Sequence, residues 1–234
     1  MAEFWQLHIV RNFILEDRWR YLTSGLQNTI LITLGALLVG LVLGALVAMV
    51  RVTHDKADSV SPLLWVLNGL AKVYLTVIRG TPVMVQLLIA YYVIFVAWDP
   101  GKMAVAIFAF GINSGAYVAE IIRGGIMSID PGQMEAGRSL GLSYWQTMRV
   151  IVLPQALKNV LPALCNEGIA LLKETSVSGY IALGELTRGA MQISSQTYDY
   201  FPPLLAIAAI YLIVVMFLTK LVSMLERRLA ESDR

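Results

Sequence analysis

Seven polar or charged side chains stand within or beside long apolar stretches of the 234-residue sequence. Asn113, Tyr117 and Glu120 have the i, i+4, i+7 spacing that places side chains on one face of an α-helix. The other four are Arg79, Gln86, Glu167 and Glu174. Guanidinium and amide groups can bind an anionic group, and carboxylates can bind a cation. Because polar groups at bilayer depth are costly, these seven residues are the candidates for solute binding.

Three of these candidates have a structural alternative that the sequence leaves open. In the alternative for Arg79, its sole role is to form an ion pair with an interior glutamate. Glu120 can lie near a helix end, where it would contact Arg123 or water. Glu174 can be an interfacial carboxylate beside Lys173.

The composition is that of a membrane protein. Hydrophobic residues make up 57% of the chain and charged residues 15%, against about 25% charged residues in a soluble domain. The net charge of +2, without a basic run, gives no indication of nucleic-acid binding. A single cysteine, Cys165, excludes an internal disulfide, and with two distant histidines no metal site is expected.

Five apolar stretches predict an all-α integral membrane protein, and they cover residues 30–50, 63–98, 103–127, 154–172 and 203–222. The second stretch has 36 residues and would run about 54 Å as one helix, too long for a single straight crossing. Gly80 and Pro82 interrupt it and can supply a turn or a kink. In the first stretch, Gly40 and Gly44 permit a close helix contact.

Residues 130–154 predict two short helices joined by a glycine. Asp130 is a suitable N-cap, and Gly141 can end the first helix in a left-handed conformation. Ser143 and Gln146 have the spacing of a capping box that begins the second helix. The segment is too polar to lie in hydrocarbon, but local chemistry alone does not distinguish it from an ordinary loop.

This loop resembles the EAA motif of bacterial ABC-importer permeases, which reads Glu-Ala-Ala, three residues, Gly, nine residues and Ile-x-Leu-Pro. The matching residues here are Glu135, Ala136, Gly137, Gly141 and the segment 151–154, which ends in Pro154. All spacings are kept. Gly137 stands in place of the second alanine, so a small residue remains at that position.

Three further segments resemble the polar amino-acid permeases of the histidine/glutamine/arginine type. They are residues 79–82 with Gln86, residues 119–126, and residues 173–176, where Glu174 stands for the family's aspartate. The resemblance implies the type I ABC-importer permease fold, with about five transmembrane helices and cytoplasmic coupling helices between spans 3 and 4. With the loop 130–154 in the cytoplasm, stretch 63–98 must cross the membrane once, bent at 79–82.

The expected organisation has three parts. Residues 1–22 form an N-terminal interfacial segment, residues 23–225 the transmembrane permease domain, and residues 226–234 a cytoplasmic tail. The resemblance places the chain in the bacterial cytoplasmic (inner) membrane, with the N-terminus outside and the C-terminus in the cytoplasm. An excess of Lys and Arg in the predicted cytoplasmic loops agrees with this orientation.

The resemblance also implies partners and an energy source. The sequence lacks a Walker A motif, so no cofactor is expected on this chain, and ATP and Mg would bind to two ATP-binding subunits docked on the EAA loop. A second permease chain and an extracytoplasmic amino-acid-binding protein complete the expected importer in its lipid bilayer. The substrate would be a polar amino acid, either basic or glutamine.

Two alternative functions remain open at this point. An ion-coupled secondary transporter would need inverted halves, and no repeat is evident in the five stretches. A non-transporting membrane scaffold would leave Arg79 and the intramembrane glutamates without a purpose.

Overall fold

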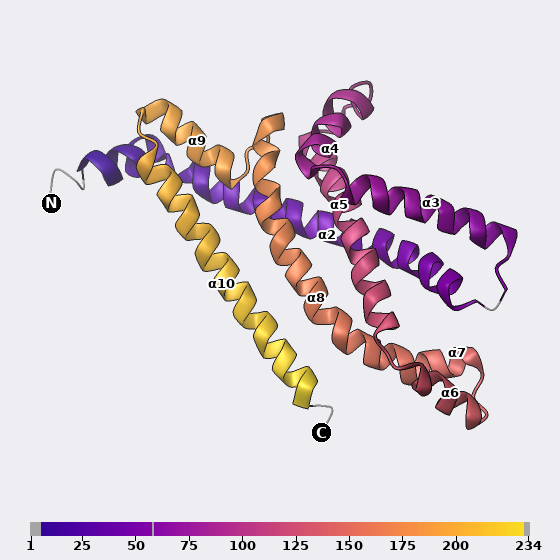
Figure 1. Ribbon diagram of the computed structural model, residues 1–234. Coiled ribbons are helices and arrows are strands. Elements are labelled where there is room, and N and C mark those ends of the chain that lie inside the picture. Colours follow the sequence, from indigo (N-terminus) through magenta and orange to yellow (C-terminus); the bar gives the residue numbers. More distant parts are fainter. Residues whose placement is uncertain (1–5, 58, 232–234) are drawn as a thin grey trace.

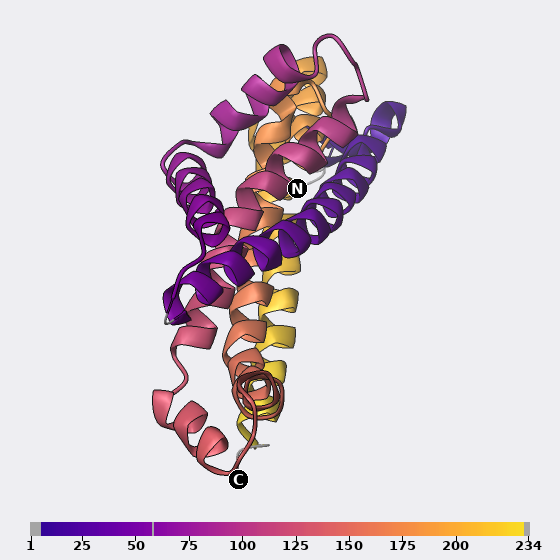
Figure 2. The same ribbon diagram turned by 90° about the vertical axis from the view of Figure 1, so that its right-hand side faces the viewer.

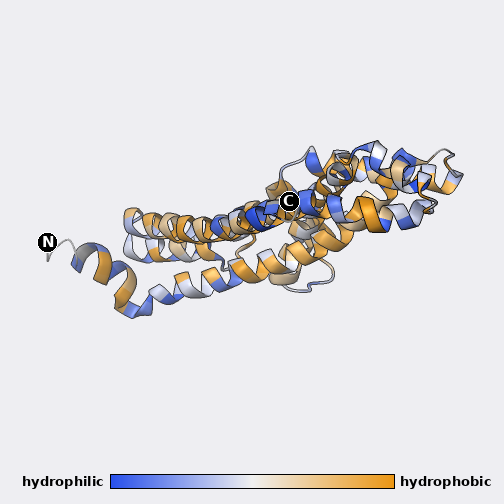
Figure 3. Ribbon diagram, turned by 90° about the horizontal axis from the view of Figure 1, so that it is seen from below, coloured by the Kyte–Doolittle hydropathy of each residue, from blue (hydrophilic) through white to orange (hydrophobic). Residues whose placement is uncertain are grey.

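The computed structural model describes residues 6–57 and 59–231, and within these ranges the chain consists of helices and loops without a strand (Figure 1). Four helical segments are long and apolar enough to cross a membrane, and hydrophobic residues cover much of their length (Figure 3). They contain α2 (Trp19–Lys56), α5 (Lys102–Met127), α8 (Leu153–Glu174) and α10 (Phe201–Glu231). The predicted all-α membrane fold is confirmed.

A bent helix pair supplies the fifth candidate span. Helix α3 (Pro62–Arg79) meets α4 (Val83–Ile89), which continues into the π-helical turn η3 (Ala90–Ile94). The helix direction bends by 106° between the two parts (Figure 2). A Cβ at Gly80 would lie 2.7 Å from the Thr76 carbonyl oxygen, so a larger residue does not fit there. Pro82 is the N-cap of α4. The predicted break at 79–82 is therefore confirmed as a sharp bend.

Helices α2 and α5 cross at close range because both carry small residues there. A Cβ at Gly40 would lie 3.1 Å from the Ser114 side chain, and one at Gly44 would lie 2.8 Å from the Gly115 carbonyl oxygen. The close contact predicted from Gly40 and Gly44 is confirmed. The fully buried Phe110 belongs to the main apolar cluster beside this crossing.

Helix α2 is much longer than the predicted span 30–50. Its 38 residues correspond to about 57 Å. The added N-terminal turns pack on α9 (Leu186–Thr197), where a Cβ at Gly25 would lie 2.8 Å from Leu186 Cα. Protein contacts therefore extend the helix beyond the length that an apolar stretch alone requires.

The N-terminal segment binds to the rest of the chain through its polar side chains. Its helical turns are η1 (Gln6–Ile14) and η2 (Leu15–Asp17), and residues 1–5 of the predicted interfacial segment lie outside the described residues. Arg18 donates to Gln196 Oε1 at 3.1 Å, and Asn12 donates to Asp199 Oδ2 at 3.1 Å. These contacts fix the segment to the end of α9 and the start of α10.

Between α8 and α9 the chain forms the 3₁₀ turn η5 (Thr175–Ile181) and a short loop. Asn28 donates to the Gly184 carbonyl at 2.7 Å, and the Leu186 amide donates to Thr29 Oγ1 at 3.2 Å. The loop is thereby tied to α2. At the other end of the chain, α10 runs through the predicted tail to Glu231, and residues 232–234 lie outside the described range.

Candidate functional site

The loop between α5 and α8 has the local structure that its sequence predicts. It contains α6 (Pro131–Ser139), α7 (Tyr144–Thr147) and the π-helical turn η4 (Met148–Val152), all at one end of the molecule (Figure 1). The Asp130 carboxylate accepts a hydrogen bond from the Gly132 amide at 2.8 Å. Gly141 has φ +85°, and Ser143 and Gln146 form both hydrogen bonds of a capping box. Pro154 lies in the first turn of α8.

The EAA-like residues divide into an exposed pair and a buried glycine. Glu135 and Ala136 are exposed, whereas Gly137 is buried against α7 and η4. A Cβ at Gly137 would lie 2.5 Å from Thr147 Cγ2 and 3.0 Å from Ile151 Cδ1. The departure from Glu-Ala-Ala therefore has a steric reason, because Thr147 already fills the space that an alanine methyl group would need.

Two large apolar side chains on the same loop face outward. Leu140 is 81% exposed and Trp145 is 72% exposed. Large exposed apolar groups on a polar loop mark a surface suited to contact with another protein. The sequence analysis did not single out either residue.

Gln86 and Asn113 bind each other across the helix bend. Gln86 Nε2 donates to the Ile78 carbonyl at 2.8 Å and to Thr81 Oγ1 at 2.8 Å, so its amide spans the break between α3 and α4. Asn113 of α5, only 3% exposed, donates to Gln86 Oε1 at 3.0 Å. Both side chains are engaged within the chain, and together they hold the bend against α5.

A chain of charged side chains links α2, α5 and the end of α3. Glu120 Oε2 lies 3.4 Å from Arg123 and 3.8 Å from Arg79, and the other face of Arg123 lies 3.4 Å from Asp55 Oδ2. The Arg79 guanidinium also lies 5.7 Å from the ring centroid of Tyr117, within cation–π range. The ion-pair alternatives for Arg79 and Glu120 are thus present as contacts.

These contacts leave part of Arg79 accessible. Its side chain is 45% exposed, against 26% for Glu120, and the ion pair at 3.8 Å is long for a direct hydrogen bond. Arg79 therefore retains donor capacity for an additional anionic group.

Glu167 and Glu174 form a separate set on α8. They are seven residues apart, which places them on one helix face about 10 Å from each other. Ser114 of α5 donates to Glu167 Oε1 at 2.8 Å. Among the described residues, neither carboxylate has a Lys, Arg or His nitrogen within 4.0 Å.

The seven candidates therefore occupy two sides of α5. Arg79, Gln86, Tyr117 and Glu120 lie with Asn113 on the side that faces the bent pair. Ser114 points to α8 from a position about 100° further around the helix. The sequence analysis did not select Asp55 or Ser114, and it considered Arg123 only as a contact of Glu120. For Arg123, the available signal was its i+3 spacing to Glu120.

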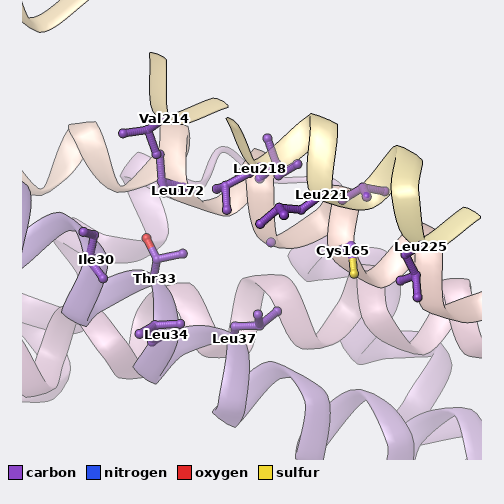
Figure 4. A pocket seen from close by; sticks show the side chains of 13 residues that line it. Ile30, Thr33, Leu34, Leu37, Cys165, Leu172, Val214, Leu218, Leu221 and Leu225 are labelled. Atoms are coloured by element: carbon purple, nitrogen blue, oxygen red, sulfur yellow. The ribbon is translucent and has the colours of Figure 1, made fainter. Parts of the chain in front are cut away.

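A groove of about 460 Å³ lies between α2, α8 and α10, and its walls are almost entirely apolar (Figure 4). Leu34, Cys165 and Leu218 are among its lining residues. None of the lining residues is charged, so this groove does not offer the groups that a zwitterionic solute needs. Within the described residues, no group of three His, Cys, Asp or Glu side chains could hold a metal ion.

Comparison with known proteins defines the class. Residues 40–231 match the family model of the binding-protein-dependent transport system inner membrane component. The chain belongs to this family and is a membrane-spanning permease component of the ABC-importer type.

Two relatives with assigned names are permease proteins of amino-acid transport systems. The chain is 36% identical over 215 residues to the arginine transport system permease protein ArtQ of Bacillus subtilis, covering 91% of this chain and 94% of that protein. It is 37% identical over 211 residues to the glutamine transport system permease protein GlnP of Escherichia coli, covering 89% and 92%.

Solved structures agree with the fold. An amino acid ABC transporter with histidines matches with a TM-score of 0.81 and 41% identity, over 89% of this chain and 94% of the other. The MetNI methionine ABC transporter, in inward-facing conformations, matches with a TM-score of 0.75 at 20% identity, which supports the fold alone. The expected type I permease fold is confirmed.

Proposed function

We propose that this chain is the transmembrane permease subunit of an ATP-driven importer for a basic amino acid. The class of transporter follows from the family, and the named relatives transport arginine or glutamine. The preference for a basic substrate is supported by one observation: among the described residues, the two carboxylates of α8 form no ion pair within 4.0 Å. Lys173, beside Glu174, acts on it only from a longer distance.

Glu167 and Glu174 would bind the cationic groups of the substrate. A carboxylate inside a membrane protein is costly unless a cation, a proton or hydrogen bonds compensate it. Glu167 has one hydrogen bond, from Ser114, and Glu174 lies two turns away on the same face. A basic amino acid carries two cationic groups, the α-ammonium and the side chain, and could therefore compensate both carboxylates.

Arg79, on the other side of α5 from Glu167 and Glu174, would bind the substrate carboxylate at a separate step of its passage. Its guanidinium is partly exposed at the helix bend and keeps unused donors. A guanidinium and a carboxylate form a charge-assisted, often bidentate pair. In this proposal, Gln86 and Asn113 fix the bend, and Glu120 and Tyr117 orient Arg79.

Energy would come from partner subunits. The exposed EAA-like residues and the outward-facing Leu140 and Trp145 would dock on two ATP-binding subunits, which carry ATP and Mg, while this chain itself hydrolyses nothing. A second permease chain would complete the pathway, and an extracytoplasmic binding protein would deliver the amino acid. The N-terminus would lie outside and the C-terminus in the cytoplasm.

The complete transporter in proteoliposomes tests this proposal through uptake of radiolabelled arginine and glutamine. Glu167→Gln keeps the acceptor oxygen for Ser114 but removes the charge. A hydrogen bond to a charged group is worth about 1.5–3 kcal/mol, so we expect KM for arginine to rise roughly 10- to 150-fold.

The matched control is Glu226→Gln, the same charge change at an exposed position of α10. It should leave KM unchanged. Equal uptake of glutamine and arginine by the wild type, or an unchanged KM for arginine in both Glu167→Gln and Glu174→Gln, would contradict a basic substrate bound by α8. Uptake that continues without the ATP-binding subunits would contradict the importer mechanism itself.

A further inference from the structure

The segment that joins η3 to α5 forms a pocket that is separate from the residues described above. It has a volume of about 240 Å³ and lies among Tyr91, Tyr92, Phe95 and Asp99. We propose that this pocket is an outer binding site for the guanidinium or ammonium group of a basic amino acid. The choice of a basic amino acid rests on the proposed function, whereas the affinity for an organic cation follows from the pocket itself.

Three of the residues that line the pocket are aromatic. Tyr91 and Tyr92 meet edge to face with ring centroids 4.8 Å apart, and Phe95 meets Phe108 of α5 in the same way at 5.1 Å. Tyr91 and Phe95 also pack against the main apolar cluster, so the fold holds these two rings in place. The face of an aromatic ring carries partial negative charge and attracts cations.

Asp99 supplies a full negative charge. Its Oδ1 atom accepts a hydrogen bond from the Gly101 amide at 3.0 Å, which fixes the carboxylate at the turn before α5. Among the described residues, Asp99 forms no ion pair within 4.0 Å. Lys102 follows in the chain, but its ammonium lies 3.3 Å from the Ala182 carbonyl oxygen and it does not line the pocket. The carboxylate of Asp99 therefore keeps acceptor capacity for a ligand.

The pocket combines the groups that recognise an organic cation. The remaining described residues of its wall are uncharged, so no cation of this wall competes with a ligand for Asp99. Aromatic faces next to a carboxylate bind guanidinium and ammonium groups by cation–π contact and by charge-assisted hydrogen bonds. A neutral amide would gain neither the full electrostatic attraction nor the cation–π contact.

The size and the position of the pocket fit a small solute. Its volume of about 240 Å³ is below the roughly 300–1,000 Å³ of pockets for drug-sized ligands, and it can accommodate the cationic end of an amino acid. Helix α4 and the loop before α5 lie at the end of the molecule away from α6 and α7 (Figures 1 and 2). In the proposed orientation this end faces the extracytoplasmic side, so a solute arriving from there can meet the pocket directly.

A thiol at position 96 can report binding without a transport step. Val96 lines the pocket and is 69% exposed. The complete transporter with Val96→Cys and with Cys165→Ala, which removes the native cysteine, is placed in nanodiscs. The rate at which a trimethylammonium methanethiosulfonate reagent modifies this chain is then measured. Ethylguanidinium should slow the reaction because it occupies the pocket, whereas ethylurea, which has a similar shape and no charge, should have no effect.

Two variants remove the parts of the pocket one at a time. Asp99→Asn keeps the acceptor oxygen for the Gly101 amide but removes the charge, and Tyr92→Leu removes a ring that is 58% exposed. Each should raise the ethylguanidinium concentration needed for half protection about two- to fivefold. The matched control is Asp17→Asn, the same charge change at an exposed residue that pairs with Arg20 at 3.1 Å. It should retain the protection of the parent protein.

Equal protection by ethylguanidinium and ethylurea, or protection by neither, would overturn the proposal, and the rings would then serve as membrane-interface anchors. Unchanged protection in both Asp99→Asn and Tyr92→Leu, or an equal loss in Asp17→Asn, would also overturn it. The labelling does not depend on uptake. Import of glutamine in preference to arginine would therefore contradict the proposed substrate, whereas absent protection in a transporter that imports arginine would contradict the pocket alone.

Discussion

Gly137 offers a direct test of how the loop 130–154 is packed. Substitution Gly137→Ala would restore the Glu-Ala-Ala pattern, and alanine is about 1 kcal/mol more favourable than glycine within a helix. The structure predicts the opposite outcome, because the new methyl group would lie 2.5 Å from Thr147 Cγ2 and 3.0 Å from Ile151 Cδ1. Overpacking of this kind costs about 1–3 kcal/mol, so the net change is a loss of about 0–2 kcal/mol.

The control is Gly124→Ala in α5, where a Cβ would have no atom within 4 Å. That variant should gain the full helix contribution of about 1 kcal/mol. The two variants therefore differ by the overpacking cost alone. Amide hydrogen exchange in the purified transporter measures how often the segment 131–147 opens. We expect Gly137→Ala to open this segment about 5- to 150-fold more often than it would if the substitution brought only the helix contribution seen in Gly124→Ala.

A second substitution tests the cause. Thr147→Ser removes Cγ2 but keeps the hydroxyl that donates to the Ser143 carbonyl at 3.0 Å. The double variant Gly137→Ala/Thr147→Ser should regain most of the lost protection. If Gly137→Ala slows exchange of the loop as much as Gly124→Ala does for α5, or if Thr147→Ser brings no recovery, the steric explanation is wrong.

Three further predictions concern other parts of the chain. Gly141→Ala should destabilise the loop conformation by about 1–2 kcal/mol, because the φ of +85° at this position is unfavourable for a residue with a Cβ. A pull-down should then retain less of the ATP-binding subunits, and unchanged retention would contradict the prediction. Asn113→Ala leaves Gln86 Oε1 without its hydrogen-bond donor and should destabilise the folded protein by about 1–3 kcal/mol. The thermal unfolding midpoint should fall in this variant and stay unchanged in Asn166→Ala, the control at an exposed position. Glu185 is the fully buried N-cap of α9. Burial raises the pKa of its carboxyl from 4.5 to about 7, so its contribution to stability is present below pH 4.5 and is lost as the pH rises through 7. Glu185→Gln should flatten this part of the stability profile, and an unaltered profile would refute the assignment.

Features set by neighbouring residues could be predicted from the sequence. The N-cap at Asp130 and the left-handed Gly141 depend on contacts within a few residues. The bend at Gly80 and Pro82 is similar, because backbone sterics decide it locally.

Features that depend on packing could not be predicted in the same way. The hydrogen bond from Ser114 to Glu167 joins residues 53 positions apart, and no spacing rule relates them. Gln86 and Asn113 were proposed to bind solute because both are polar at membrane depth, and only the structure shows that they bind each other. The length of α2 was underestimated because its first turns are held by α9, a contact that hydropathy does not report.

The glycines of this protein set two different constraints on how its sequence can drift. At Gly137 the obstacle is the side chain of Thr147, so an exchange at one position can be compensated at the other, and the pair can evolve together. At Gly44 the obstacle includes the Gly115 carbonyl oxygen, which would lie 2.8 Å from any Cβ placed there. No replacement elsewhere removes a main-chain atom. The crossing of α2 and α5 is therefore expected to stay invariant among descendants of this chain, while the loop 130–154 can diversify.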